Sequence, residues 1–161
     1  MDQLDFVNQT VAAWRRHNDI QLLLIASIPA DGFAAVPLKS RGRTVAAQLA
    51  HVNAVRAGWL HYHATGKRPA RSPKDESPSR ADLTREFKES GEAVGTYLAQ
   101  ALNGAAKVRM FGGNPYRWLL YLVSHESHHR GQIALALKQA GMRLPEKVAM
   151  QGLWGTWFFG K

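Results

Sequence analysis

The sequence has no cysteine, and this absence removes several kinds of chemistry at once. Without a thiol the chain can form no disulfide, no thiolate metal ligand and no cysteine nucleophile. Any thiol chemistry must therefore use a thiol that a substrate brings in. The sequence also lacks a run of eighteen apolar residues, and residues 1–5, MDQLD, are acidic where a signal peptide is basic and then apolar. We therefore expect a cytoplasmic protein with no membrane partner.

Acidic residues are scarce, since 12 Asp and Glu stand against 21 Lys and Arg and give a net charge of +9. Such a balance raises the question of nucleic-acid binding. The basic residues gather in two segments that we interpret as loops: Lys39, Arg41 and Arg43, and Lys67, Arg68, Arg71 and Lys74. Because no stacking aromatic platform, zinc-finger spacing or helix-turn-helix accompanies them, the pattern favours a solvated basic surface. Loops that steer an anionic small substrate are the alternative.

Four long segments carry apolar residues at helical spacing, which predicts an all-α protein. The predicted helices cover residues 2–28, 44–65, 79–103 and 114–140. Thr44, Ser79 and Asn114 are residues that cap a helix N-terminus, Pro115 suits the first helical position, and Gly66 is a stop signal. A length of 161 residues suits one domain, so we predict a single four-helix bundle over residues 1–161 with long crossover loops.

Several stretches outside the regular helical pattern have other roles. Residues 67–79 are rich in proline, charge and serine, and we interpret them as a mobile connector. Residues 107–111 suit a strand-like connector. The small residues Ser90, Gly91 and Gly95 of the third helix either allow close helix contact or leave room for a ligand. The C-terminal tail, residues 151–161, is too aromatic for water, so we expect it to pack over one end of the bundle or to form a subunit interface.

Two histidines of the fourth predicted helix form the clearest chemical motif. His125 and His129 are four residues apart, so their rings leave one face of the helix about one turn from each other and can converge on one ion. They lie on a seam that should face the interior: Trp118, Leu122, His125, His129, Gln132 and Ala136. A buried imidazole without a partner costs free energy. The pair therefore indicates a metal site, and two core histidines satisfied by polar neighbours are the alternative.

The second predicted helix supplies a third histidine. Its inward series reads Gln48, His51, Val55, Gly58 and Tyr62. His61 and His63 lie near the end of this helix, beside a basic loop, and we expect them to be exposed. Three neutral imidazoles hold a divalent ion and leave at least one position for water or substrate, as in catalytic rather than structural sites. Imidazole ligands are compatible with zinc, nickel, iron and copper, of which we favour zinc or nickel.

The same stretch matches the HExxH motif of metalloproteases, in which Glu126 would be the general base. The extended form of that motif requires glycine and histidine where this sequence has Gln132 and Leu135. No edge strand is predicted that could bind a peptide. We therefore rank a metalloprotease behind the other interpretations and expect Glu126 to point away from the ion.

Three parts of the sequence resemble one known family. They are the block from His125 to Ile133 (HESHHRGQI), residues 44–51 (TVAAQLAH) and the tryptophan-rich C-terminus. Together they look like the DinB-like family of metalloenzymes, which is related to bacillithiol S-transferases and mycothiol-dependent maleylpyruvate isomerases. The resemblance implies an antiparallel four-helix bundle, commonly dimeric, whose metal is held by His51, His125 and His129. It also implies that His128 is not a ligand.

These observations predict a metal-dependent transferase or hydrolase. Its metal would activate a thiol or water for attack on a small electrophilic substrate, and the expected partners are a low-molecular-weight thiol and a second copy of the chain. Asn18, Tyr62 and Gln132, which lie on inward-facing seams, are candidates for contacts to the ligands or the substrate. The alternatives are a non-enzymatic binding protein of the stress or DNA-damage response, and a structural bundle that a metal merely tightens.

Overall fold

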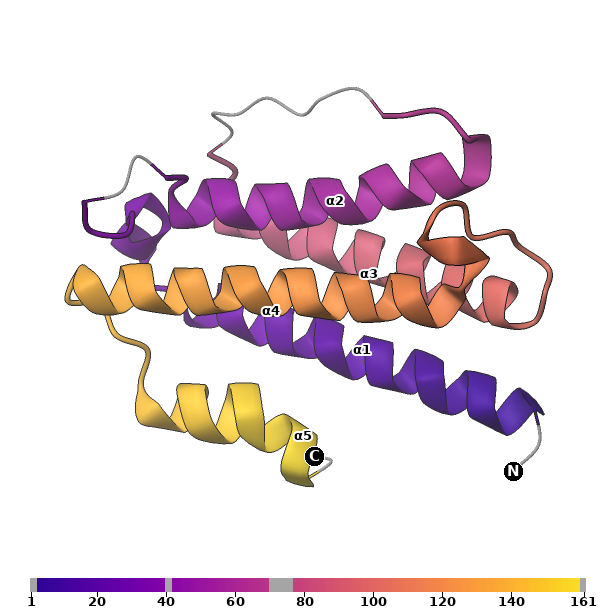
Figure 1. Ribbon diagram of the computed structural model, residues 1–161. Helices are drawn as coiled ribbons and strands as arrows, with labels where there is room; N and C mark the ends of the chain where they lie inside the picture. The colour runs from indigo at the N-terminus through magenta and orange to yellow at the C-terminus, as the bar shows by residue number, and fades with distance from the viewer. Residues whose placement is uncertain (1–2, 40–41, 70–76, 160–161) are drawn as a thin grey trace.

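The computed structural model describes residues 3–39, 42–69 and 77–159. Within these ranges the chain forms helices and no strands, which confirms the predicted all-α class. The long helices, which lie alongside one another in Figure 1, are α1 (Gln3–Ser27), α2 (Val45–Thr65), α3 (Arg80–Leu102) and α4 (Pro115–Gln139). None of the described helices has the length and hydrophobicity of a membrane span.

Local sequence signals set the ends of these helices. Side-chain oxygens of Thr44, Ser79 and Asn114 accept backbone N–H groups in the first turns of α2, α3 and α4. Gly66 follows α2 with a φ of 72°, a left-handed conformation that glycine adopts without steric cost. Because these caps satisfy backbone groups that have no partner within the helix, the predicted boundaries agree with the structure to within two residues or so.

Two connecting segments contain short 3-10 helices, and one of these segments differs from its prediction. The first loop contains a short 3-10 helix, η1 (Ala30–Ala34). Residues 107–111 form no strand, and η2 (Phe111–Gly113) begins at their end. Most of the predicted mobile connector, residues 70–76, and the basic residues Arg41, Arg71 and Lys74 lie outside the described residues.

The C-terminal tail forms a π-helix, η3 (Lys147–Trp154), followed by α5 (Gly155–Phe159), and both contact α1. At Gly152, η3 approaches α1 so closely that an added Cβ would lie 2.6 Å from a methyl carbon of Leu23. Three aromatic side chains nevertheless remain largely exposed: Trp154, Phe158 and Phe159. The tail therefore packs against α1 with one side and presents aromatic rings on the other.

The interior consists of two apolar clusters that are separated along the helices by polar side chains. One cluster includes Ile20, Leu24, Leu49, Phe87 and Ile133. The other includes Trp14, Val94, Leu98, Trp118 and Leu122. Buried polar residues lie between the two clusters, and we call them the polar layer: His17, Asn18, Gln21, Arg56, Ser90 and Glu126. Glu126 of the polar layer directly follows His125 on α4, so this layer lies next to the histidine motif.

Gly91 settles the role of the small residues in α3. An added Cβ at Gly91 would lie 2.5 Å from the Asn18 side chain, and the Gly91 carbonyl accepts a 2.8 Å hydrogen bond from Trp14 Nε1. Glycine at this position therefore allows α1 and α3 to come into close contact, which was one of the two alternatives left open by the sequence.

Helix α2 is rotated relative to the prediction. Its buried face carries Val45, Leu49, Val52, Arg56 and His63, whereas His51, Val55, Gly58 and Tyr62 are only half-buried. The prediction that His63 is exposed was wrong, because its ring packs edge-on against Trp118 at 4.7 Å and the side chain is 1% exposed. His61 is exposed as predicted. The rotation leaves His51 at the edge of the core, where a ligand can reach it.

Candidate metal centre

One histidine of α2 and two of α4 converge at the edge of the core. Each of His51, His125 and His129 offers a ring nitrogen, and the three nitrogens lie within 4.8 Å of one another. The His51 ring centroid is 5.3 Å from that of His125 and 5.1 Å from that of His129, and the two α4 rings are 4.7 Å apart. The structure thus brings together the three residues that the sequence pointed to as ligands.

The surroundings keep these imidazoles neutral. Burial lowers the pKa of His51, and the positive charge of Arg43 and the neighbouring His125 lower it further. Burial, together with the other histidines and Arg43, lowers the pKa of His129 to about 4. For His125 the lowering by burial outweighs the opposite effect of the Glu126 carboxylate. At neutral pH each ring therefore keeps a lone pair that a cation can accept.

Two ring nitrogens show how the site suits an ion. His129 Nδ1 lies 3.4 Å from Gln48 Oε1, so the tautomer that donates to this amide leaves Nε2 free as a ligand. His125 Nδ1 is buried and has no hydrogen-bond partner among the described residues. Since an orphaned buried polar atom costs free energy, a cation between the rings would be stabilising. The donor set fits a divalent ion and leaves a coordination position for water or substrate.

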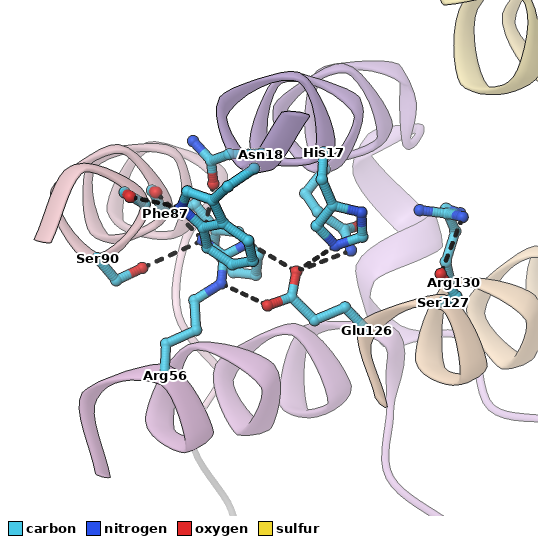
Figure 2. Close-up of polar contacts among 11 residues, drawn as sticks. His17, Asn18, Arg56, Phe87, Ser90, Glu126, Ser127 and Arg130 are labelled. Atoms are coloured by element: carbon cyan, nitrogen blue, oxygen red, sulfur yellow. Dashed lines mark hydrogen bonds and ion pairs between the residues drawn. The ribbon is translucent and has the colours of Figure 1, made fainter. Parts of the chain in front are cut away.

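The polar layer next to this site is organised around Glu126 (Figure 2). Arg56 donates to both of its carboxylate oxygens, with Nε to Oε1 at 2.7 Å and Nη2 to Oε2 at 2.6 Å. His17 Nε2 and Gln21 Nε2 contact Oε2 at 3.0 and 3.1 Å. Residues of three helices, α1, α2 and α4, are therefore joined through one buried carboxylate.

The other side of the Arg56 guanidinium is equally well occupied. Nη1 donates to Asn18 Oδ1 at 2.7 Å and to Ser90 Oγ at 3.3 Å. Its central carbon lies 5.0 Å from the centroid of the Trp14 ring and 4.7 Å from that of Phe87, within range of cation–π attraction. Every helix of the four thus contributes to the environment of this one cation.

Glu126 stays ionised within this network. Burial alone would raise its pKa, but the charge and hydrogen bonds of Arg56, with the contact from His17, lower it to about 2. Both carboxylate oxygens are engaged, so Glu126 is not available as the general base of an HExxH protease. This agrees with the expectation that the carboxylate points away from the ion site formed by His51, His125 and His129.

The remaining predicted contact residues lie in different places. Asn18 belongs to the polar layer, where it binds Arg56. Gln132 Nε2 lies 2.9 Å from Nε2 of His128, an exposed residue, and so contacts a ring outside the three-histidine group. Tyr62 lines a pocket beside that group. Among these three residues, Tyr62 is thus the one that lines this pocket.

Arg56 and His17 contact Glu126, next to the candidate metal centre, and the sequence did not lead us to either residue. Arg56 follows Leu49 and Val52 at helical spacing, on the apolar face of α2, and a charge on a buried face requires a partner. Glu126 occupies the equivalent position on α4, four residues after Leu122. The sequence thus holds two charges at core-facing spacings, but only the fold shows that they pair with each other.

A pocket of about 480 Å³ opens beside the histidines, with walls from α2 and α4. Val55 lies one turn after His51, and Tyr121 lies one turn before His125, so the pocket begins about 5.4 Å along each helix from a candidate ligand. The Tyr121 ring stacks on His125 with centroids 5.8 Å apart and an angle of 17°. A small molecule in this pocket would therefore lie next to the candidate metal centre.

Comparison with known proteins assigns the chain to a family. A search of curated proteins found no match. The model of the DinB family matches residues 1–155, a range that includes all three histidines, the polar layer and the pocket. The chain therefore belongs to the DinB family.

Proposed function

We propose that this protein is an enzyme in which His51, His125 and His129 hold a divalent metal ion for the activation of a thiol or water. The observation that carries the proposal is the convergence of three neutral imidazoles beside an apolar pocket. Zinc or nickel is the expected ion, with iron and copper as alternatives. The chemistry that such an ion supplies is a lowered pKa of bound thiol or water, and hence a nucleophile near neutral pH.

The protein's own residues contribute orientation and a dry environment. The Gln48 amide fixes the tautomer of His129, and the Arg56–Glu126 pair holds α2 against α4. The Tyr121 ring stacks on His125 and covers one face of that imidazole. We infer that the reaction is attack on a small electrophile, either transfer to a thiol or hydrolysis. The resemblance to bacillithiol- and mycothiol-dependent enzymes favours a low-molecular-weight thiol, which a chain without cysteine must receive from outside.

Metal analysis tests the first step of this proposal. The protein is purified without a histidine tag, incubated with zinc or nickel, desalted and analysed by elemental mass spectrometry. We expect stoichiometric metal in the wild type and in His61→Ala, which removes an exposed histidine of α2, and a loss of most of the metal in His125→Ala. Equal, negligible metal in the wild type and His125→Ala would refute the proposal.

Activity tests the second step. The loaded protein is mixed with a thiol and a panel of aryl halides, epoxides and activated esters, and both thiol consumption and ester hydrolysis are followed. We expect turnover of at least one class by the wild type and His61→Ala, and none by His125→Ala. Metal binding without turnover of any class would favour a structural role for the ion.

We also infer that the chain forms one domain, an antiparallel four-helix bundle, that associates as a homodimer. The exposed aromatic side chains of Trp154, Phe158 and Phe159 support the association, since a cluster of this kind is typical of an interface. Sedimentation should give the mass of a dimer for the wild type and of a monomer for Trp154→Ser/Phe158→Ser. A monomeric wild type at micromolar concentration would contradict this inference.

A further inference from the structure

We infer that the pocket beside the histidines binds a flat aromatic small molecule that carries one negative charge. That this molecule is the substrate rests on the proposed function, whereas its binding requires only the pocket. The volume of about 480 Å³ lies within the range of small-molecule sites and suits a compound of one or two rings.

Three half-buried aromatic side chains form the walls that recognise the ring. Trp59 stands edge-on to Tyr62 at 6.0 Å and 85°, and edge-on to Tyr121 at 5.9 Å and 84°. Aromatic pairs in stacked or edge-on arrangements are stabilised beyond the burial of their surface, so these walls favour a ligand that adds another ring. Ala54 and Gly58, two small residues, line the same pocket and take up little of its volume.

One cation supplies the charge preference. Among the described residues that line the pocket, Arg68 alone is charged, and no carboxylate in the described part of the chain pairs with it. A guanidinium that pairs with no described carboxylate and lies beside an apolar wall favours an anionic group, which it can bind through two N–H donors. The net charge of the whole chain is +9, and this positive charge also favours the approach of an anionic ligand.

The positions along α2 give the bound molecule a direction. Pro69 returns to within 3.3 Å of the Cβ position of Gly58, which lies seven residues and two turns after His51. Arg68, the residue before Pro69, therefore lies about 10 Å along α2 from His51, in a part of the pocket remote from the histidines. An anion held by Arg68 turns the opposite end of the ring toward His51 and His125, where the proposed reaction takes place.

Calorimetric titration with 2-naphthoate tests the inference on metal-depleted protein, so that the carboxylate cannot bind an ion. We expect saturable binding by the wild type. Ala54→Phe fills the pocket and should weaken binding at least tenfold, whereas Ala57→Phe places the same ring on the exposed face of α2 and should change it less than twofold. Circular dichroism confirms that both variants keep the helical fold.

Substitution of the exposed residue Arg68 tests the preference for a negative charge without disturbing the core. Arg68→Gln should weaken 2-naphthoate binding three- to tenfold and leave 2-naphthalenemethanol, its neutral analogue, unaffected, while Lys67→Gln should change neither. Three results would overturn the inference: no binding by the wild type, equal affinities in Ala54→Phe and Ala57→Phe, or equal losses of affinity in Arg68→Gln and Lys67→Gln. Because no metal is present, these outcomes are independent of whether the histidines bind an ion.

Discussion

Arg56 and Glu126 form a bidentate ion pair at 2.6 and 2.7 Å in which neither side chain is more than 1% exposed. Arg56 lies five residues after His51 on α2, and Glu126 directly follows His125 on α4. Because the pair joins the two helices within about a turn of the ligand positions, it fixes how the histidines face one another. The ion pair is therefore a positioning device for the candidate metal centre, although neither residue belongs to it.

Removing one partner of this pair should destabilise the fold strongly. Arg56→Met leaves the Glu126 carboxylate buried without its counter-charge, and the expected loss in the free energy of unfolding is about 3–5 kcal/mol by urea denaturation. The exposed pair of Arg15 and Glu92, at 3.2 Å, is the matched control, and Arg15→Met should cost no more than about 1 kcal/mol. Comparable losses in the two variants would show that the buried pair does not fix the helices.

The close contact between α1 and α3 predicts opposite effects of one substitution at two glycines. Gly91→Ala forces a methyl group against Asn18 and should cost roughly 1–3 kcal/mol in the free energy of unfolding. At Gly131, in α4, an added Cβ meets no atom within 4 Å, so Gly131→Ala should stabilise by roughly 0.5–1 kcal/mol through its higher helix propensity. Thermal denaturation of both variants checks the sign of each effect.

Gln48 should influence metal affinity without being a ligand. Because its amide faces His129 Nδ1, Gln48→Ala should lower the affinity for zinc roughly 10- to 100-fold in a competition assay with a chromophoric chelator. Gln132→Ala removes an amide that faces His128 and should leave the affinity unchanged. Equal affinities in the two variants would show that the contact at 3.4 Å does not orient the imidazole.

His63 should make the fold sensitive to acid. Burial, with the charge of Arg109, lowers its pKa from 6.5 to about 4, so the folded state holds the neutral ring while the unfolded chain takes up a proton below pH 6.5. The contribution of His63 to the free energy of unfolding is therefore fully present above pH 6.5. It falls as the pH drops toward 4, by on the order of 3 kcal/mol. In His63→Phe the difference in unfolding free energy between pH 7 and pH 4 should shrink by that amount. His61→Phe, at an exposed position, should keep the wild-type pH dependence.

The helix ends and the pair of His125 and His129 on α4 could be predicted because their signals are local. Thr44, Asn114 and Gly66 act on backbone groups within a few residues, and the spacing of His125 and His129 fixes their relation on any helix. These features do not depend on how the helices are arranged in space.

The buried face of α2 could not be predicted in the same way. Apolar residues are spread around this helix, so its pattern does not define one inward side, and the face with Arg56 and His63 was missed. The partners that stabilise Arg56 come from three other helices, and no pattern within residues 45–65 reveals them. The position of a buried charge is a property of the assembled fold, because only that fold supplies its counter-charge.

The two apolar clusters and the Arg56–Glu126 pair hold α2 against α4 through side chains other than the three histidines. In the proposed metalloenzyme, folding would therefore not depend on the metal. Under the proposed function, the active fraction would follow the supply of metal, and a chelator would abolish activity without unfolding the protein.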